Sequence, residues 1–165
     1  MKKFVFFFII SCCIICIAAA CSRSDEAPTV GAKLFFIDAE LNRLLAYEDE
    51  LPDADKEHMA RTAIEKLKVG RPDNEKIRQL LPRGKEKVTV EVRGDNIAYV
   101  DLERSIAEQL PRSRDIERLF IYQIVDTLTS IKGIRYVRFT VDGSIRKDFM
   151  GYYDMRETYR YTYPE

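Results

Sequence analysis

The segment Asp115–Gly143, DIERLFIYQIVDTLTSIKGIRYVRFTVDG, decides the fold. Its first part repeats apolar residues at three- and four-residue spacing, which places them on one face of a helix. Gly133 follows this pattern and suits the end of a helix, where a left-handed residue is common. Residues 137–141 then alternate between apolar and polar, the period of a half-buried strand. We therefore expect a helix at 114–131 and the strand after it to form the centre of the core.

The first residues of the chain have the pattern of an export signal. Two lysines after the initial Met precede the almost wholly apolar run Phe4–Ala20. A charged start, an apolar middle and small residues before a polar stretch are typical of a secretory signal peptide. Three alanines directly before Cys21 resemble a bacterial lipobox, although Ala18 stands where Leu is usual. We predict a lipoprotein signal peptide at 1–20 and lipid (palmitate) on Cys21. A retained membrane anchor is the alternative, because the run approaches spanning length.

The remaining cysteines and the charge balance restrict the class of protein. Cys12, Cys13 and Cys16 all lie inside the apolar run, so the expected exported domain has no disulfide and no cysteine-based metal site. Without residues 1–20, 25 basic residues face 27 acidic ones. Such a balance argues against nucleic-acid binding and against a polybasic membrane surface. Ser22, rather than Asp, after Cys21 favours the outer membrane in a Gram-negative cell; in either membrane, the domain should lie on the extracytoplasmic face.

Local patterns predict a tether and then one domain. We expect a lipidated cysteine and flexible tether at 21–32 and a domain at 33–165. We interpret residues 41–51 as the second strand of a hairpin, and the start of a helix is the alternative. The other expected elements are a strand at 33–39, a helix at 55–69, a short helix in 75–81, a hairpin at 88–92 and 97–103, a helical turn at 105–110 and a return strand from Ile145.

An ordered set of short motifs resembles the GerMN domain. A strand ending at Asp38 precedes the motifs Leu-x-x-Gly at Leu67–Gly70, Leu-Pro-x-Gly at Leu81–Gly84, Val-Asp-Leu at Val100–Leu102, Val-x-Thr-Leu at Val125–Leu128 and Val-x-x-x-Val-Asp-Gly at Val137–Gly143. The resemblance covers nearly all of 33–155. It implies an α+β fold: a single domain with a mixed β-sheet and two main helices packed on one face.

The GerMN family takes in GerM-like sporulation and germination proteins and LpqB-like lipoproteins. The resemblance implies an interaction module tied to the cell envelope, usually by a lipid, and related in shape to ring-building domains. It supplies no catalytic residues to transfer. This sequence carries the pattern once, whereas the spore-former proteins carry it twice, so the resemblance does not extend to a spore role.

The sequence offers little for catalysis. The single histidine, His58, lies off the apolar stripe of its helix and should face solvent. Nucleophilic triads need a buried, oriented base, and a metal site usually needs several nitrogen or sulfur ligands. We therefore predict no catalytic, cofactor-binding or metal residues. Asp38, Asp101 and Asp142 follow strands, where aspartate suits turns. A wall hydrolase with a carboxylate of raised pKa remains the enzymatic alternative.

The C-terminal end is rich in tyrosine, and its aromatic rings are the candidate binding residues. Exposed tyrosines can anchor a protein partner or stack on sugar rings; alternation of Tyr, Arg and Thr from 159 onward instead fits one face of an edge strand that covers the core. The candidates are Tyr152, Tyr153, Tyr159, Tyr161 and Tyr163.

We predict a membrane-anchored lipoprotein with a non-catalytic GerMN-like interaction domain that scaffolds or recruits envelope proteins, including copies of itself. A lipoprotein that binds cell-wall glycan (peptidoglycan) through the C-terminal tyrosines is the alternative.

Overall fold

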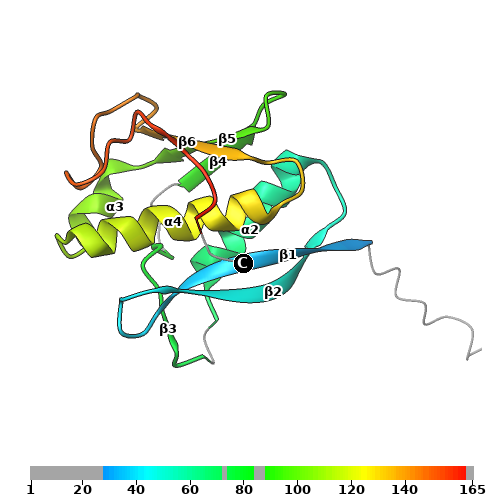
Figure 1. The fold of residues 1–165 in the computed structure, drawn as a ribbon, viewed down its shortest axis with the longest axis horizontal. Helices are drawn as coiled ribbons and strands as arrows, with labels where there is room; N and C mark the ends of the chain where they lie inside the picture. Colours follow the sequence, from blue (N-terminus) through cyan, green and yellow to red (C-terminus); the bar gives the residue numbers. More distant parts are fainter. Residues whose placement is uncertain (1–27, 72–73, 84–87, 163–165) are drawn as a thin grey trace, which may run out of the picture.

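The computed structural model describes residues 28–71, 74–83 and 88–162. Two β-sheets enclose a layer of helices, with one sheet above and the other below that layer in Figure 1. The elements in chain order are β1 (Thr29–Asp38), β2 (Leu44–Pro52), α2 (Lys56–Val69), β3 (Ile77–Arg78), β4 (Val88–Val92), β5 (Ile97–Leu102), α3 (Arg104–Gln109), α4 (Arg114–Ser130), β6 (Tyr136–Val141) and β7 (Thr158–Tyr159).

The two sheets differ in how their strands run. The three-stranded sheet has the order β2-β1-β3 and is antiparallel throughout. The four-stranded sheet has the order β4-β5-β6-β7 and is mixed, because β5 and β6 are parallel. Parallel neighbours need a long crossover, and here α3 and α4 supply it. That crossover places α4 against the sheet, next to α2.

The helix layer contacts both sheets. Helix α2 packs on β4 on one side and on β1 and β2 on the other, while α4 packs on β6 and β1. The apolar stripe of α2, Ala60, Ala63, Ile64 and Leu67, is fully buried. Asp55 caps α2 by accepting a hydrogen bond from His58 N at 2.9 Å, and Gly70 ends it at a φ of 71°.

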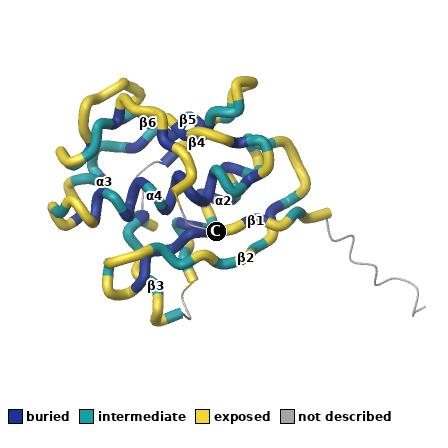
Figure 2. Tube along the Cα trace, viewed as in Figure 1, coloured by how far each residue is buried: buried dark blue, intermediate teal, exposed yellow. Residues whose placement is uncertain are grey.

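Helix α4 is buried almost all round, and Figure 2 shows dark blue running along much of its length. Several of its polar residues are therefore buried too, and Thr127 and the half-buried Ser130 bond to the main chain of β1. Thr127 Oγ1 accepts from Phe35 N at 2.9 Å, and Ser130 Oγ accepts from Lys33 N at 3.1 Å. Strand β3 pairs with Ile37 and Asp38 on the edge of β1 that faces away from β2. The two hydroxyls satisfy that edge at Lys33 and Phe35, so α4 there takes the place of a neighbouring strand.

The α+β class, the single domain and the GerMN-like fold are confirmed. The expected mixed sheet with both main helices on one face is the four-stranded sheet. The expectation of one sheet missed the second: β1, β2 and β3 form a separate sheet on the far side of the helices. The hairpin interpretation of 41–51 is also confirmed, since β1 and β2 pair from Thr29↔Pro52 to Ile37↔Leu44.

Several boundaries and one helix were wrong. Strand β1 begins at Thr29, so the last four residues of the expected tether belong to the domain; residues 21–27 lie outside the described residues. Residues 75–81, all of which the structure describes, do not form the expected short helix. Ile77 and Arg78 instead pair with β1, and Gln79 Nε2 donates to Leu67 O at 2.7 Å at the end of α2. An extended chain allows both the pairing with β1 and the hydrogen bond to α2, whereas a helix would allow neither.

Two further differences concern the end of the chain. Helix α4 ends at Ser130 rather than at Gly133, whose φ of 93° belongs to the turn that follows. The return strand expected from Ile145 does not form. Only an isolated bridge joins Val141 and Ser144, and the chain then runs as a loop to β7.

Candidate interaction surface

The outer edge of β2 is the longest strand edge that the described residues leave unpaired. Strand β2 has nine residues and ends the three-stranded sheet. In an antiparallel pair, the backbone N–H and C=O groups of two opposite residues either bond to each other or both point away from the partner strand. Phe35 N and Lys33 N bond to α4, so their partners Ala46 and Glu48 direct N–H and C=O to the outer edge. Glu50 belongs to the same outward set.

Acidic residues mark this edge. Glu48 and Glu50 are exposed, and each has a neighbour on β1: Lys33 Nζ lies 3.7 Å from Glu48, and Thr29 Oγ1 donates to Glu50 at 2.8 Å. Glu50 N donates to the side chain of Asp49, so Ala46 and Glu48 hold the clearest outward amides. Both lie on the solvent-exposed positions of the strand.

Asp49 lies between these glutamates on the opposite face of the strand. Its carboxylate pairs with Lys66 at 2.6 Å and with Arg71 at 3.8 Å. Burial acts to raise the pKa of Asp49, but the Lys66 and Glu50 hydrogen bonds and the charges of Lys66 and Arg71 outweigh it, and the pKa lies below its ordinary value. Asp49 is therefore committed to holding α2 against β2.

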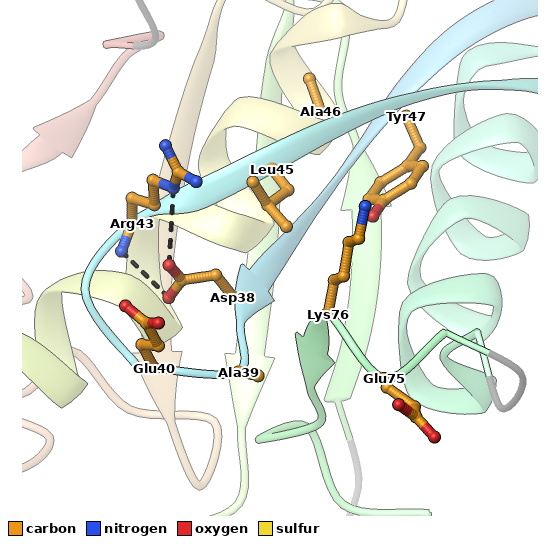
Figure 3. Close-up of a pocket in the computed structure, with 9 residues that line it drawn as sticks. All are labelled: Asp38, Ala39, Glu40, Arg43, Leu45, Ala46, Tyr47, Glu75 and Lys76. Atoms are coloured by element: carbon orange, nitrogen blue, oxygen red, sulfur yellow. Dashed lines mark hydrogen bonds and ion pairs between the residues drawn. The ribbon is translucent and has the colours of Figure 1, made fainter.

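A pocket of about 730 Å³ opens beside the turn between β1 and β2. Figure 3 shows Asp38 and Arg43 joined at the turn, with Tyr47 and Lys76 across the pocket from them. The carboxylate of Asp38 accepts from Asn42 N at 2.8 Å and from Arg43 N at 3.3 Å. Asp38 therefore holds the turn, as its place at a strand end predicted, and its oxygens are occupied.

A second cavity, of about 640 Å³, lies where the turn meets α4 and the C-terminal segment. Arg43 borders both cavities. Asp126 lies in its wall with 1% of the residue exposed, and its Oδ1 accepts from Thr162 N at 3.0 Å. Burial raises the pKa of Asp126 to about 6, against a smaller lowering by the Thr162 hydrogen bonds. Burial also raises the pKa of the neighbouring Tyr122.

The C-terminal tyrosines do not form one face. Strand β7 stops at Tyr159, which is buried and packs edge-on against Phe139 and Tyr122 at 5.4 and 6.0 Å between ring centroids. Its hydroxyl donates to Asp154 O, and burial raises its pKa well above the ordinary value. Tyr159 therefore covers the core and offers no binding ring.

The other tyrosines point to different places. Tyr161 leaves the sheet and packs edge-on against Phe35 at 5.8 Å. Tyr152 is 47% exposed, while its neighbour Tyr153 is half-buried and borders the second cavity. Tyr163 lies outside the described residues. The expected strand face from 159 onward is wrong, because the chain turns away from β6 to cross α4.

Two acidic residues of α4 were not predicted as structural. Glu117 is fully buried and accepts from Met150 N at 2.9 Å and from Tyr152 N at 2.8 Å. With Asp126, it ties the C-terminal segment to the helix. Their burial could not be predicted from sequence, because backbone amides leave no pattern that would identify them as partners.

The predicted lack of catalytic and metal-binding residues can be compared only with the residues that the structure describes. His58 is exposed on α2, and the described part of the chain contains no cluster of metal-ligating side chains. None of its helices is both long and apolar enough to cross a membrane. Cys21 and the apolar run before it lie outside the described residues.

The fold, with its two sheets and enclosed helices, defines an α+β domain of the GerMN type. A family model described as "Germane: Sporulation and spore germination" matches residues 33–147. The chain belongs to this family, as the sequence motifs indicated.

Solved structures agree on the fold. The tandem GerMN domains of the sporulation protein GerM from Bacillus subtilis match at a TM-score of 0.59 and 22% identity; the match covers 79% of this chain and 45% of that one. The first GerMN domain of the same protein matches at 0.56 and 22%, covering 78% and 94%. A candidate lipoprotein from Clostridium perfringens matches at 0.56 and 19%, covering 80% and 87%. The chain thus spans less than half of the tandem protein. No curated protein matches it.

Proposed function

We propose that this protein is a membrane-anchored lipoprotein whose domain recruits another envelope protein without catalysing a reaction. The lipid would be on Cys21, and the domain would stand close to the extracytoplasmic face of its membrane. Membership of the Germane family and the likeness to a candidate lipoprotein support this proposal. The sporulation role of the Bacillus subtilis relative belongs to that protein.

The observation that carries the proposal is the outer edge of β2. Unpaired N–H and C=O groups in a row are a template for an added strand, and strand addition is a common mode of protein recognition. In β2 these outward groups belong to Ala46 and Glu48, with Leu44 beside them. Main-chain bonds would give the affinity, and the side chains on either face would select the partner.

Charge specifies the partner further. The solvent face of β2 carries Glu48 and Glu50, and opposite charges across a strand pair stabilise it whereas like charges destabilise it. The strand that binds should therefore carry Lys or Arg at alternate positions. Two copies of β2 paired about Glu48, Asp49 or Glu50 would place acid opposite acid. A different protein is thus favoured over self-association as the occupant of this edge.

In-cell photocrosslinking tests this function. A photoreactive residue at Glu48 of the full-length protein should capture a partner that mass spectrometry identifies. Ala46→Pro removes an outward N–H and no bond to β1, so it should abolish the crosslink while the fold survives. Ala46→Ser changes the side chain and keeps the amide, and should leave the crosslink in place. Capture of no protein at Glu48, or a crosslink that survives Ala46→Pro, would refute strand addition at β2.

A further inference from the structure

The second cavity has the composition of a ligand site, and Leu44 is the one residue of β2 in its wall. Three separate parts of the chain build its walls: the turn with Asn42, helix α4 with Arg118, Tyr122 and Asp126, and the C-terminal segment with Tyr153. Its volume of about 640 Å³ falls within the range of small-molecule pockets, which is roughly 300–1,000 Å³.

The aromatic rings of the cavity are held in place without a ligand. Tyr122 packs edge-on against the buried ring of Tyr159, with 6.0 Å between centroids. The guanidinium of Arg114 lies 6.0 Å from the ring centre of Tyr153. The main chain just before Tyr153 is fixed by Glu117, which accepts from Tyr152 N. Rings that are already oriented lose little freedom on binding, which favours affinity.

The charges in the cavity are largely balanced. Arg43 pairs with Asp38 at 3.5 Å, and Arg118 pairs with Asp115 at 3.8 Å and reaches Asn42 O at 3.5 Å. Both guanidinium groups therefore have carboxylate neighbours of their own. This balance, with a carboxyl group in the wall, does not favour an anionic ligand. The walls still offer donors and acceptors of hydrogen bonds.

The ligand that fits has an apolar face for a tyrosine ring and several neutral hydroxyl or amide groups at its rim. Pyranose sugars combine these features: ring C–H groups on one face, and hydroxyls that donate and accept at the edge. The hydroxyl of Thr162 and the amide of Asn42 are matching groups in the wall. We propose that the cavity between the β1–β2 turn, Tyr122 and Tyr153 is a saccharide-binding site.

Titration calorimetry on the full-length protein in detergent tests the site. The probes are chitotriose, which carries N-acetyl groups, and maltotriose, which does not. At least one should bind saturably. Tyr153→Ala should then weaken binding at least tenfold, while Tyr153→Phe, which keeps the ring, should stay within about threefold. Tyr152→Ala is the matched control: this exposed neighbour is not part of the cavity wall, so binding should be unchanged.

Thermal melting of each variant separates loss of binding from loss of fold. If Tyr153→Ala does not fold, Leu44→Asp, which places a charge in the same wall, should weaken binding instead. Co-sedimentation with purified peptidoglycan sacculi distinguishes a wall glycan from a soluble sugar: Tyr153-dependent retention assigns the wall as the source, and calorimetric binding without retention assigns a soluble saccharide. The proposal is overturned if neither sugar nor sacculi bind, or if Tyr152→Ala weakens binding as much as Tyr153→Ala.

Discussion

Asp126 should make the stability of this domain depend on pH. Asp126 is 1% exposed, and no described cation forms an ion pair with its carboxyl group. Burial raises its folded-state pKa from 3.8 to about 6. The folded state therefore holds the proton more tightly than the unfolded chain does. The stabilising contribution is fully present below pH 3.8 and is lost as the pH rises through about 6.

The size of the pKa change of Asp126 gives the size of its effect on the free energy of unfolding. At about 1.4 kcal/mol per pKa unit, an ionised Asp126 lowers the free energy of unfolding by roughly 3 kcal/mol. Asp126→Asn removes the charge and keeps an oxygen that can accept from Thr162 N. The variant should match the wild type near pH 3.5 and be more stable by up to roughly 3 kcal/mol at pH 8.

Urea denaturation followed by circular dichroism, at several pH values from 3.5 to 8, measures this difference. Asp115→Asn is the control on the same helix, because its carboxylate is 75% exposed. The control should leave the pH dependence of the wild type unchanged. A difference between Asp126→Asn and the wild type that stays constant from pH 4 to pH 8 would refute the burial argument.

The other predictions concern the core, the α4–β1 contact and the anchor. Leu128→Ala should lower the free energy of unfolding by about 2–5 kcal/mol in the same assay, because Leu128 is fully buried; a loss under about 1 kcal/mol would contradict its place in the core. Thr127→Val keeps the shape but leaves the amide of Phe35 unsatisfied, so the loss should be about 1–3 kcal/mol, and an unchanged stability would show that α4 does not satisfy the edge of β1. Cys21→Ser should abolish incorporation of labelled palmitate and leave the protein with an uncleaved signal peptide on a gel; labelled, normally processed protein would exclude lipidation at Cys21.

Local sequence patterns predicted the elements whose side chains alternate or repeat cleanly. The stripes of α2 and α4 and the alternation of β4, β5 and β6 each follow from one segment alone. The second sheet did not follow, because residues 34–38 of β1 are buried on both faces and their pattern does not show where the neighbouring strands lie. Burial of Glu117 and Asp126 was missed for a related reason: their partners are amides more than thirty residues away in sequence.

The candidate site was predicted only in part. The tyrosine-rich end drew attention because its rings are numerous. Of the four described candidates, Tyr159 and Tyr161 are used in packing, and only Tyr153 borders a cavity. The importance of Ala46 could not be predicted. Its outward amide follows from the bond of Phe35 to Thr127 on a distant helix.

Length and charge together single out β2 among the free edges. Strand β7 pairs only with Val137 and Arg138 of β6, and β4 has five residues, whereas β2 has nine. A long free edge is a hazard, because any extended chain can add to it and start aggregation. Glu48 and Glu50 reduce that hazard, since two copies of the strand repel each other when they pair about Glu48, Asp49 or Glu50. The same two charges favour a basic strand, so the residues that keep the domain from pairing with itself also select the partner that we propose.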